Sequence, residues 1–450
     1  MLRKLLSLSV VIFAMTLCAT LSAQAFDEWK IIHAGTLLSD AREEAEFEKS
    51  IIVRNNLIVQ VRDGYTEPGE VSGTANARVV DLKDHFVMPG LIDSHTHILK
   101  QQEPNRREIR VTRSSELSAL MGVEYGLRTL RAGFTTIRNV GGDRNAIFAL
   151  RDAINQGIVM GPRIRASGQT ITPTGGHGDG GGFRDDIFPH PHSGVCDGIE
   201  ECRTAVRTQI KFGADHIKYV ATGGVLSITA TGTGQQFTDE EQIALVEAAH
   251  AMGRKVAAHA HGKIGIEAAL RAGVDSIEHG SFLDAGTADL FVATGAYLVP
   301  TLIAGNTVER IATERPDFYP PEVRQKALEV GPVMRTALRT AYEKGVKIAF
   351  GTDAGVNDHG TNAYEAVLMN DAGMPERAIL ISATINAAEL IGVTDVTGTI
   401  EEGKDADIIA VSGDPLEDIS TLLRPDYVMA RGNEVNLDVP PVDLFPWPDI

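Results

Sequence analysis

The feature that most constrains the fold is an alternation of short apolar runs with longer helical stretches through the middle of the chain. The apolar runs span residues 86–88, 135–139, 163–166, 216–220, 255–259, 276–279, 297–301 and 346–350. Strands that alternate with helices pair in parallel, which makes the region an α/β fold. Eight such units predict a (β/α)8 TIM-like barrel, and a doubly wound sheet is the minor alternative.

Short β-like segments flank this region at both ends of the chain. Neither end has enough strands to form an independent core, so we expect them to combine into one small β-sandwich. The predicted organisation is a signal peptide at 1–25, the N-terminal portion of the β-sandwich at 26–85, the barrel at 86–392, the C-terminal portion of the β-sandwich at 393–436 and a C-terminal tail at 437–450.

The first residues have the pattern of a secretory signal peptide. Arg3 and Lys4 precede an uncharged apolar run at 5–17, and small residues follow up to Ala25. The run is shorter than the roughly 20 residues that a membrane-spanning helix needs. We therefore expect cleavage near Ala25, secretion to the periplasm and no integral membrane segment. A lipid-anchored form through Cys18 is the alternative, although Leu17 is a poor residue to precede a lipidated cysteine.

The charge balance argues against one class of partner. The chain has 42 Lys and Arg against 60 Asp and Glu, a formal net charge of −18. Such an acidic protein is not attracted to nucleic acid or to anionic membranes, so we expect neither. Cys196 and Cys202 remain after cleavage and are close enough in sequence to pair in an oxidising compartment. Geometry decides whether this disulfide forms, and the sequence leaves it open.

Groups that bind cations follow five of the predicted strands. In a parallel barrel the carboxyl ends of the strands share one face, where active sites lie. Imidazole and carboxylate are the usual ligands of zinc and similar ions. The alternative is that these are ordinary buried polar residues, and it would require five strands to end in such groups by chance. The candidate groups are His95 and His97, Lys218, His259 with His261, His279, and Asp353.

In the segments around these groups the chain resembles the amidohydrolase superfamily, and the resemblance covers most of its length. The matching segments are 88–97 (MPGLIDSHTH), 213–218 (GADHIK), 256–262 (VAAHAHG), 276–280 (SIEHG), 350–355 (FGTDAG), 383–389 (ATINAAE) and 403–408 (GKDADI). The resemblance is closest to the secreted, peptidase-like branch. That branch includes dipeptidases for Xaa-Pro, Xaa-Arg/Lys and Xaa-hydrophobic substrates, N-acyl amino acid hydrolases and ochratoxin amidohydrolases.

The resemblance implies a centre of two divalent metal ions, most simply zinc, that activates water against an amide bond. His95, His97 and Asp353 would hold one ion, and His259 and His279 the other. Lys218, carboxylated on its amine, would bridge the two. Asp353 would also carry the proton from water to the leaving amine.

Further residues are candidates for substrate contacts. His177, in a glycine-rich loop, is the leading candidate to stabilise the oxyanion, with Tyr219 as the alternative donor. Glu278 is interpreted either as a partner that orients His279 or as a surface acid. Relatives often carry Asp where Asn139 stands, which puts an ion pair there in doubt. The remaining candidates to line the substrate pocket are Arg184, which could pair with a substrate carboxylate, His261 and His359.

Three hypotheses follow for the function. The first is a secreted binuclear hydrolase of a dipeptide, an N-acyl amino acid or a related amide such as an ochratoxin. The second is a cyclic-amide hydrolase or deaminase of the same superfamily. The third is a non-catalytic binding protein that has kept the fold. For the enzymes we expect a small-molecule amide substrate and, by resemblance to relatives, a homo-oligomer.

Overall fold

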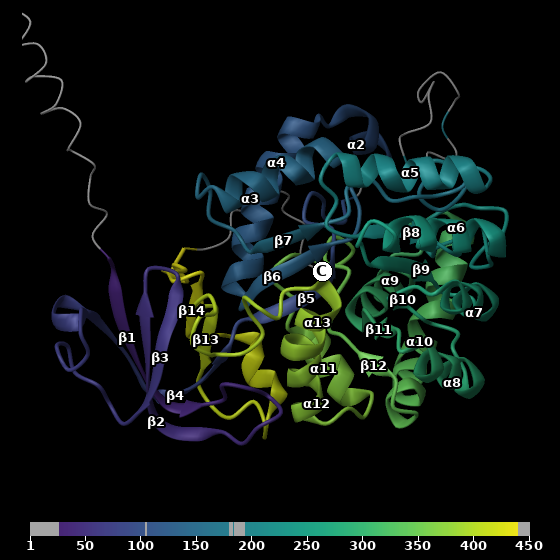
Figure 1. Ribbon diagram of the computed structural model, residues 1–450. Coiled ribbons are helices and arrows are strands. Elements are labelled where there is room, and N and C mark those ends of the chain that lie inside the picture. The colour runs from purple at the N-terminus through teal and green to yellow at the C-terminus, as the bar shows by residue number, and fades with distance from the viewer. Residues whose placement is uncertain (1–26, 104–105, 180–182, 184–193, 440–450) are drawn as a thin grey trace, which may run out of the picture.

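A computed structural model describes residues 27–103, 106–179, 183 and 194–439 (Figure 1). The predicted signal peptide, Arg184 and most of the C-terminal tail lie outside the described residues. Within them, no helix combines the length and the apolar character needed to cross a membrane.

Eight parallel strands form two neighbouring sheets. One sheet has the order β12-β11-β10-β9-β8 and the other the order β5-β6-β7. Single parallel bridges join their edges, Ile171 to Tyr219 on one side and Thr96 to Ala354 on the other. The strands are β5 (Leu91–Thr96), β6 (Phe134–Asn139), β7 (Arg163–Ala166), β8 (Ile217–Val220), β9 (Val256–Ala260), β10 (Ser276–His279), β11 (Tyr297–Val299) and β12 (Lys347–Ile348).

Helices lie around the outside of these strands (Figure 1). A capping box formed by Thr238 and Glu241 begins α6. The helices are α2 (Arg106–Thr112), α3 (Ser115–Arg131), α4 (Arg144–Asn155), α5 (Ile199–Lys211), α6 (Asp239–His250), α7 (Lys263–Ala272), α8 (Ala285–Thr294), α9 (Leu302–Glu314), α10 (Pro321–Glu343), α11 (Tyr364–Asp371), α12 (Glu376–Ile381) and α13 (Ala387–Ile391). The main apolar core packs between these helices and the strands.

Strands from the N-terminal and C-terminal parts of the described chain share a separate sheet. Instead of two distinct layers, hydrogen bonds link all seven strands in the single order β15-β14-β13-β4-β1-β2-β3. This sheet has its own small core, which includes Ile32, Val53 and Ile408. Its strands are β1 (Trp29–Leu37), β2 (Glu46–Arg54), β3 (Leu57–Asp63), β4 (Arg78–Pro89), β13 (Ile408–Val411), β14 (Tyr427–Ala430) and β15 (Asn433–Glu434).

The predicted first barrel strand, residues 86–88, is wrong. These residues end β4 and pair with β13 in the terminal sheet. The chain changes sheets at Gly90, whose amide donates to the Asp407 carbonyl, and β5 begins at Leu91. A side chain at Gly90 would meet Thr135 at 2.3 Å, so only glycine fits this close crossing. Because apolar residues continue on both sides of Gly90, periodicity alone did not mark the change.

Candidate metal centre

Two histidines from β5 and the loop that follows it lie together with one from β10. The ring centroids of His95 and His97 are 5.7 Å apart, and those of His95 and His279 are 5.0 Å apart. Ligand atoms of His95, His279 and Asp353 all lie within 4.8 Å of one another. Residues from three distant segments of the chain therefore lie close together.

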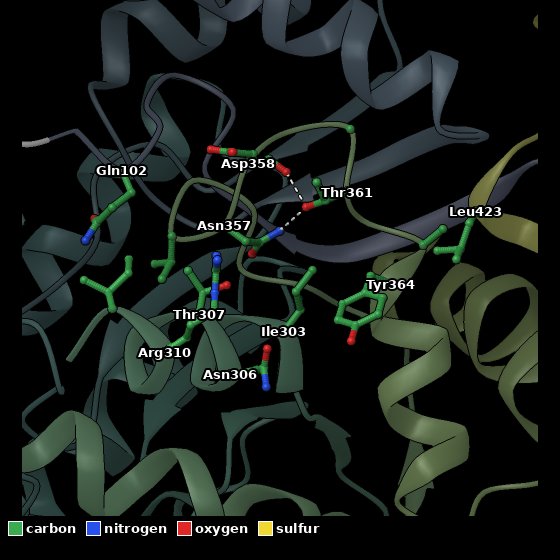
Figure 2. Close-up of a pocket in the computed structure, with 14 residues that line it drawn as sticks. Gln102, Ile303, Asn306, Thr307, Arg310, Asn357, Asp358, Thr361, Tyr364 and Leu423 are labelled. Carbon is green, nitrogen blue, oxygen red and sulfur yellow. Dashed lines mark hydrogen bonds between the residues drawn. The ribbon is translucent and has the colours of Figure 1, made fainter. Parts of the chain in front are cut away.

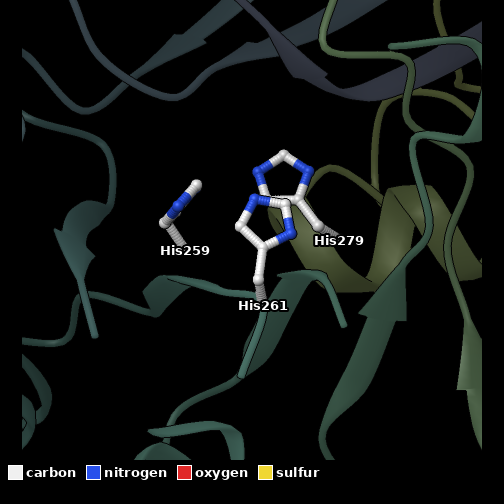
Figure 3. Close-up of side chains that lie close together, drawn as sticks. All are labelled: His259, His261 and His279. Atoms are coloured by element: carbon white, nitrogen blue, oxygen red, sulfur yellow. The ribbon is translucent and has the colours of Figure 1, made fainter. Parts of the chain in front are cut away.

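Three histidines form a second group that shares His279 with the first. The ligand nitrogens of His259, His261 and His279 lie within 4.8 Å of one another. Figure 3 shows the rings of His261 and His279 lying over one another, with His259 beside them; the interplanar angle of the stacked pair is 9°. His261, predicted only as a substrate contact, is thus placed where it could itself hold a cation.

Asp353 joins the first group from the segment after β12. Its Oδ1 lies 3.4 Å from Nε2 of His95 and 3.3 Å from Nε2 of His97. Burial opposes ionisation, but the charges of His95 and His97 outweigh it and hold the pKa of Asp353 well below its usual value. The carboxylate is therefore anionic where a cation would sit.

Glu278 holds His95 in place. Its Oε2 lies 2.7 Å from Nδ1 of His95, and its Oε1 accepts hydrogen bonds from Arg138 at 2.7 Å and from Ser276 at 2.5 Å. The Glu278 side chain is fully buried. The sequence hypothesis that Glu278 orients its neighbour His279, or lies at the surface, is therefore wrong. Glu278 is hydrogen-bonded to His95, and the hydroxyl of Thr301 holds His279 instead.

Four other histidines are fixed in the same way through Nδ1. Such anchors set the ring orientation and leave Nε2 for the centre of the site. The partners of Nδ1 are the Gly141 carbonyl for His97 at 2.9 Å, the Thr301 hydroxyl for His279 at 2.7 Å, the Ser281 hydroxyl for His261 at 2.8 Å and the Ser227 hydroxyl for His177 at 2.7 Å.

Lys218 is buried on β8 beside these groups. Burial lowers the pKa of its amine to about 8, and its charge in turn contributes to the lowered pKa values of His259 and His279, for which burial is the largest cause. The buried polar atoms without a hydrogen-bond partner in the described residues include three at this site, namely Lys218 Nζ, His259 Nε2 and Asp353 Oδ1. Buried polar atoms rarely remain unpaired, so this donor set suits a bound cation.

His177 and Tyr219, the two predicted oxyanion donors, are placed differently. The His177 ring stacks on His259 with centroids 4.4 Å apart, and burial lowers its pKa to about 3, so the ring is neutral. Tyr219 donates instead to Gln242 on α6, at 2.9 Å. Because Tyr219 neighbours Lys218 on β8, its side chain faces the helices, and it is not an oxyanion donor.

His359 lies outside the histidine groups. Its ring stacks on Tyr125 at 4.7 Å, and its Nε2 lies 2.8 Å from the Lys100 carbonyl. The flanking residues Asn357 and Asp358 line a cavity of about 550 Å³ together with α9 residues such as Arg310 (Figure 2). None of the clustered histidines lines that cavity.

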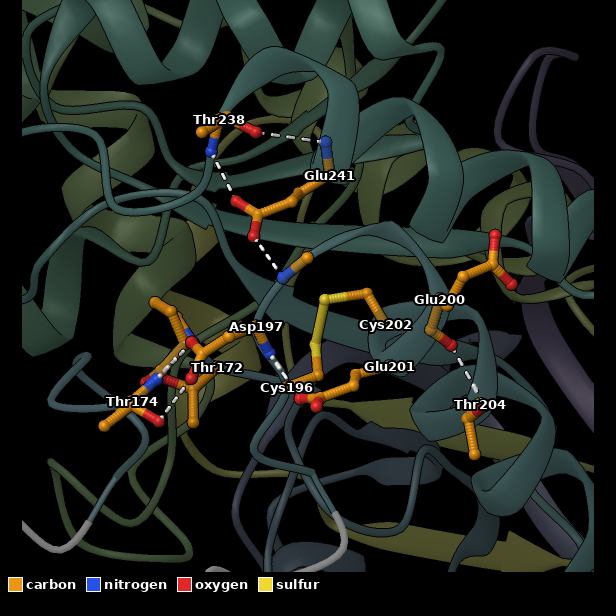
Figure 4. The surroundings of a disulfide bond; sticks show 12 residues. Thr172, Thr174, Cys196, Asp197, Glu200, Glu201, Cys202, Thr204, Thr238 and Glu241 are labelled. Atoms are coloured by element: carbon orange, nitrogen blue, oxygen red, sulfur yellow. Dashed lines mark hydrogen bonds between the residues drawn. A yellow bond between two sulfur atoms is a disulfide. The ribbon is translucent and has the colours of Figure 1, made fainter.

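Cys196 and Cys202 form a disulfide, which decides the question that the sequence left open (Figure 4). The Cys196 amide donates to the Thr172 carbonyl at 3.1 Å. The bond thereby fastens the start of α5 beside the segment that leads into the His177 loop.

Sequence reasoning missed several residues that support the site. Arg138 on β6 is buried and donates to Glu278 and to the Ser94 carbonyl. A buried-strand pattern that places an arginine beside Ile137 was the available signal. Thr301 and Ser227 gave no such signal, because a hydroxyl in a loop is common and only the fold brings these two to a histidine. Asn139, the departure from relatives, accepts the Ile98 amide at 2.8 Å and shapes the turn after His97.

Comparison with known proteins gives a consistent result. The family described as the amidohydrolase family matches residues 86–435. Ochratoxinase from Aspergillus niger is 32% identical over 416 residues, which cover 88% of this chain and 84% of that enzyme. A Xaa-Pro dipeptidase with methionine bound in its active site is 43% identical, with a TM-score of 0.85 over 90% of this chain and 99% of that one. A prolidase complexed with N-methylphosphonate-L-proline is 32% identical, with a TM-score of 0.80 over 90% and 99%.

The chain therefore belongs to the amidohydrolase family. It is a hydrolase that acts on amide bonds, in the peptidase-like part of the superfamily.

Proposed function

We propose that the protein is a secreted, binuclear metal-dependent hydrolase that cleaves the amide bond of a dipeptide, an N-acyl amino acid or a related amide of the ochratoxin kind. The observation that carries this proposal is the juxtaposition of two histidine groups, Asp353 and the unpartnered amine of Lys218. We also infer that the eight parallel strands close into a (β/α)8 barrel, with these groups at the carboxyl ends.

In this proposal His95, His97 and Asp353 hold one ion, and His259 and His279 hold the other. The Lys218 ammonium would first lose one proton, and attack of the neutral amine on carbon dioxide would then form an N–C bond and release a second. The cation would thereby become an anionic carbamate, whose oxygens could face both ions. An ammonium between two dications would repel both, so the buried, unpartnered Nζ favours the modified form. Two bound zinc ions would supply a water of lowered pKa and polarise the substrate carbonyl.

The residues of the chain then have distinct tasks. Asp353 accepts the proton of the attacking water through Oδ1 and delivers it to the nitrogen of the leaving amine. His177 is neutral, and when Nδ1 accepts from Ser227 its Nε2–H is free to donate to the developing oxyanion. Glu278 keeps His95 oriented throughout.

The relatives favour an amide whose leaving group is an amino acid. Ochratoxinase and a Xaa-Pro dipeptidase are each similar to this chain over most of its length. A cyclic-amide hydrolase or deaminase remains the second candidate. Its products would differ from those of a peptidase-like enzyme, which releases a free amino acid. For the setting of the enzyme we propose the periplasm after cleavage near Ala25, and assembly as a homo-oligomer.

The test is a panel of Xaa-Pro, Xaa-Arg, Xaa-Phe and N-acyl-Phe amides with enzyme stripped by a chelator and reloaded with zinc. We expect release of a free amino acid, loss of activity on stripping and recovery on reloading. Release of ammonia would favour the deaminase, and a purified protein without metal and without zinc rescue would favour a binding protein. In Asp353→Asn turnover should fall by at least about 10³-fold while the circular dichroism spectrum is kept; full activity would contradict the assigned proton transfer.

A further inference from the structure

Lys326 projects from α10 onto a loop at the edge of the site. Its ammonium donates to the Gly224 carbonyl at 2.6 Å and to the Ser227 carbonyl at 2.5 Å. Both acceptors belong to the loop that follows β8, the strand of Lys218. A residue from a helix far along the chain thus reaches the carboxyl end of that strand.

The same loop is in direct contact with His177. A Cβ on Gly224 would lie 2.2 Å from the His177 ring, so glycine alone allows this approach, and the Ser227 hydroxyl lies 2.7 Å from His177 Nδ1. His177 in turn stacks on His259. Lys326 therefore contacts the loop that packs against the predicted oxyanion donor and holds its Nδ1.

The charge of Lys326 has no carboxylate counterpart in the described part of the chain. No carboxylate there lies within 4.0 Å of its ammonium, although the charge of Glu322, one turn earlier on α10, acts on it from farther away. The side chain is partly buried. An ammonium has three N–H donors, and the two carbonyls use only two of them. A partly buried cation with a spare donor is a ready site for an anion.

We propose that Lys326 binds the free carboxylate of the substrate's amino-acid part and so sets a preference for amides that end in a carboxylate. This inference rests on the proposed function. The sequence analysis gave Arg184 as the candidate partner of a substrate carboxylate. Lys326 is a second candidate and comes from a helix rather than from a strand end. The alternative is that Lys326 only fastens the loop that carries Gly224 and Ser227.

The test compares the best carboxylate substrate of the panel with its carboxamide analogue, in which that one group is neutral. In Lys326→Met the ratio of kcat/KM for acid over amide should fall about tenfold or more, mainly through KM for the acid, because a charge-assisted hydrogen bond is lost. Lys326→Arg should restore most of the ratio. Lys344→Met is the matched control at the other end of α10, where the lysine pairs with Asp289 at 2.9 Å, and it should keep the ratio of the wild type.

The outcomes separate the role of Lys326 from the proposed function. If Lys326→Met lowers kcat for acid and amide equally and leaves their ratio unchanged, Lys326 is a loop anchor and the inference fails while the proposed function stands. If the wild type hydrolyses neither compound, both fail. Thermal unfolding of each variant identifies any that is misfolded. If Lys326→Met is misfolded, the ratio of kcat/KM for acid over amide in Lys326→Arg decides: a ratio near that of the wild type supports the inference, and a ratio about tenfold lower contradicts it.

Discussion

Three residues of the site have a backbone conformation that L-amino acids rarely adopt. His279, Thr301 and Asp353 have φ angles of 73°, 52° and 58°. Each follows or ends a parallel strand, and each contributes to the histidine groups: two as proposed ligands, and Thr301 as the partner of His279. Strain of this kind costs about 1–3 kcal/mol per residue and persists where function requires the geometry. The geometry of the proposed metal centre is therefore set by the backbone as well as by the side chains.

Glu278 is not itself a proposed metal ligand. It contacts the proposed ligand His95 and so acts on the metal site through that residue. Glu278→Gln keeps the size but removes the charge that faces Arg138 and orients His95. We expect the affinity for Zn²⁺ to fall about 10–100-fold, as for other partners of metal-bound histidines. Competition with a chromophoric chelator measures the affinity, with Glu46→Gln at an exposed ion pair as the control. Unchanged affinity in Glu278→Gln would contradict the positioning role.

At the scale of elements, the sequence predicted the alternation of strands and helices. It did not predict the contacts that depend on how separate elements pack. Strand ends bearing His95, Lys218, His259 and Asp353 were found because parallel topology fixes which end they share. The exclusion of Tyr219 was also available, since alternation on β8 places it opposite Lys218. Periodicity could not show that β4 ends at Pro89 or that Thr301 contacts His279, because each depends on how separate elements pack.

The disulfide joins α5 to the segment that precedes it, so its effect on stability is local to that helix. Its cysteines are 6 positions apart in sequence, and both are buried. Replacing both Cys196 and Cys202 by alanine should lower the free energy of unfolding by about 2–3 kcal/mol, since the unfolded chain gains freedom. Urea unfolding measures this change. Treatment of the wild type with a reductant should reproduce it, and equal stability of all three samples would show that the bond contributes nothing.

At the scale of the whole molecule, an ion network ties the terminal sheet to the parallel strands. Arg163 on β7 donates to Thr136 on β6 and to two carboxylates before β13, Asp405 at 2.5 Å and Asp407 at 2.7 Å. Asp407 is buried and also accepts the Arg431 amide. Ion pairs therefore connect the terminal segments, which were predicted to combine into one small unit, to the parallel strands.

Arg163→Met tests whether this network makes the two regions unfold together. The variant keeps much of the side-chain volume but leaves the buried carboxylate of Asp407 without its cation, which we expect to cost about 3–5 kcal/mol. A single urea transition in the wild type should then shift or split into two in Arg163→Met, as followed by circular dichroism and by the fluorescence of Trp29 on β1. Asp63→Asn, which removes an exposed partner of Lys49, should leave the transition nearly unchanged because water already screens that pair. If the two variants behave alike, the buried network does not couple the regions, and the terminal sheet is held by packing alone.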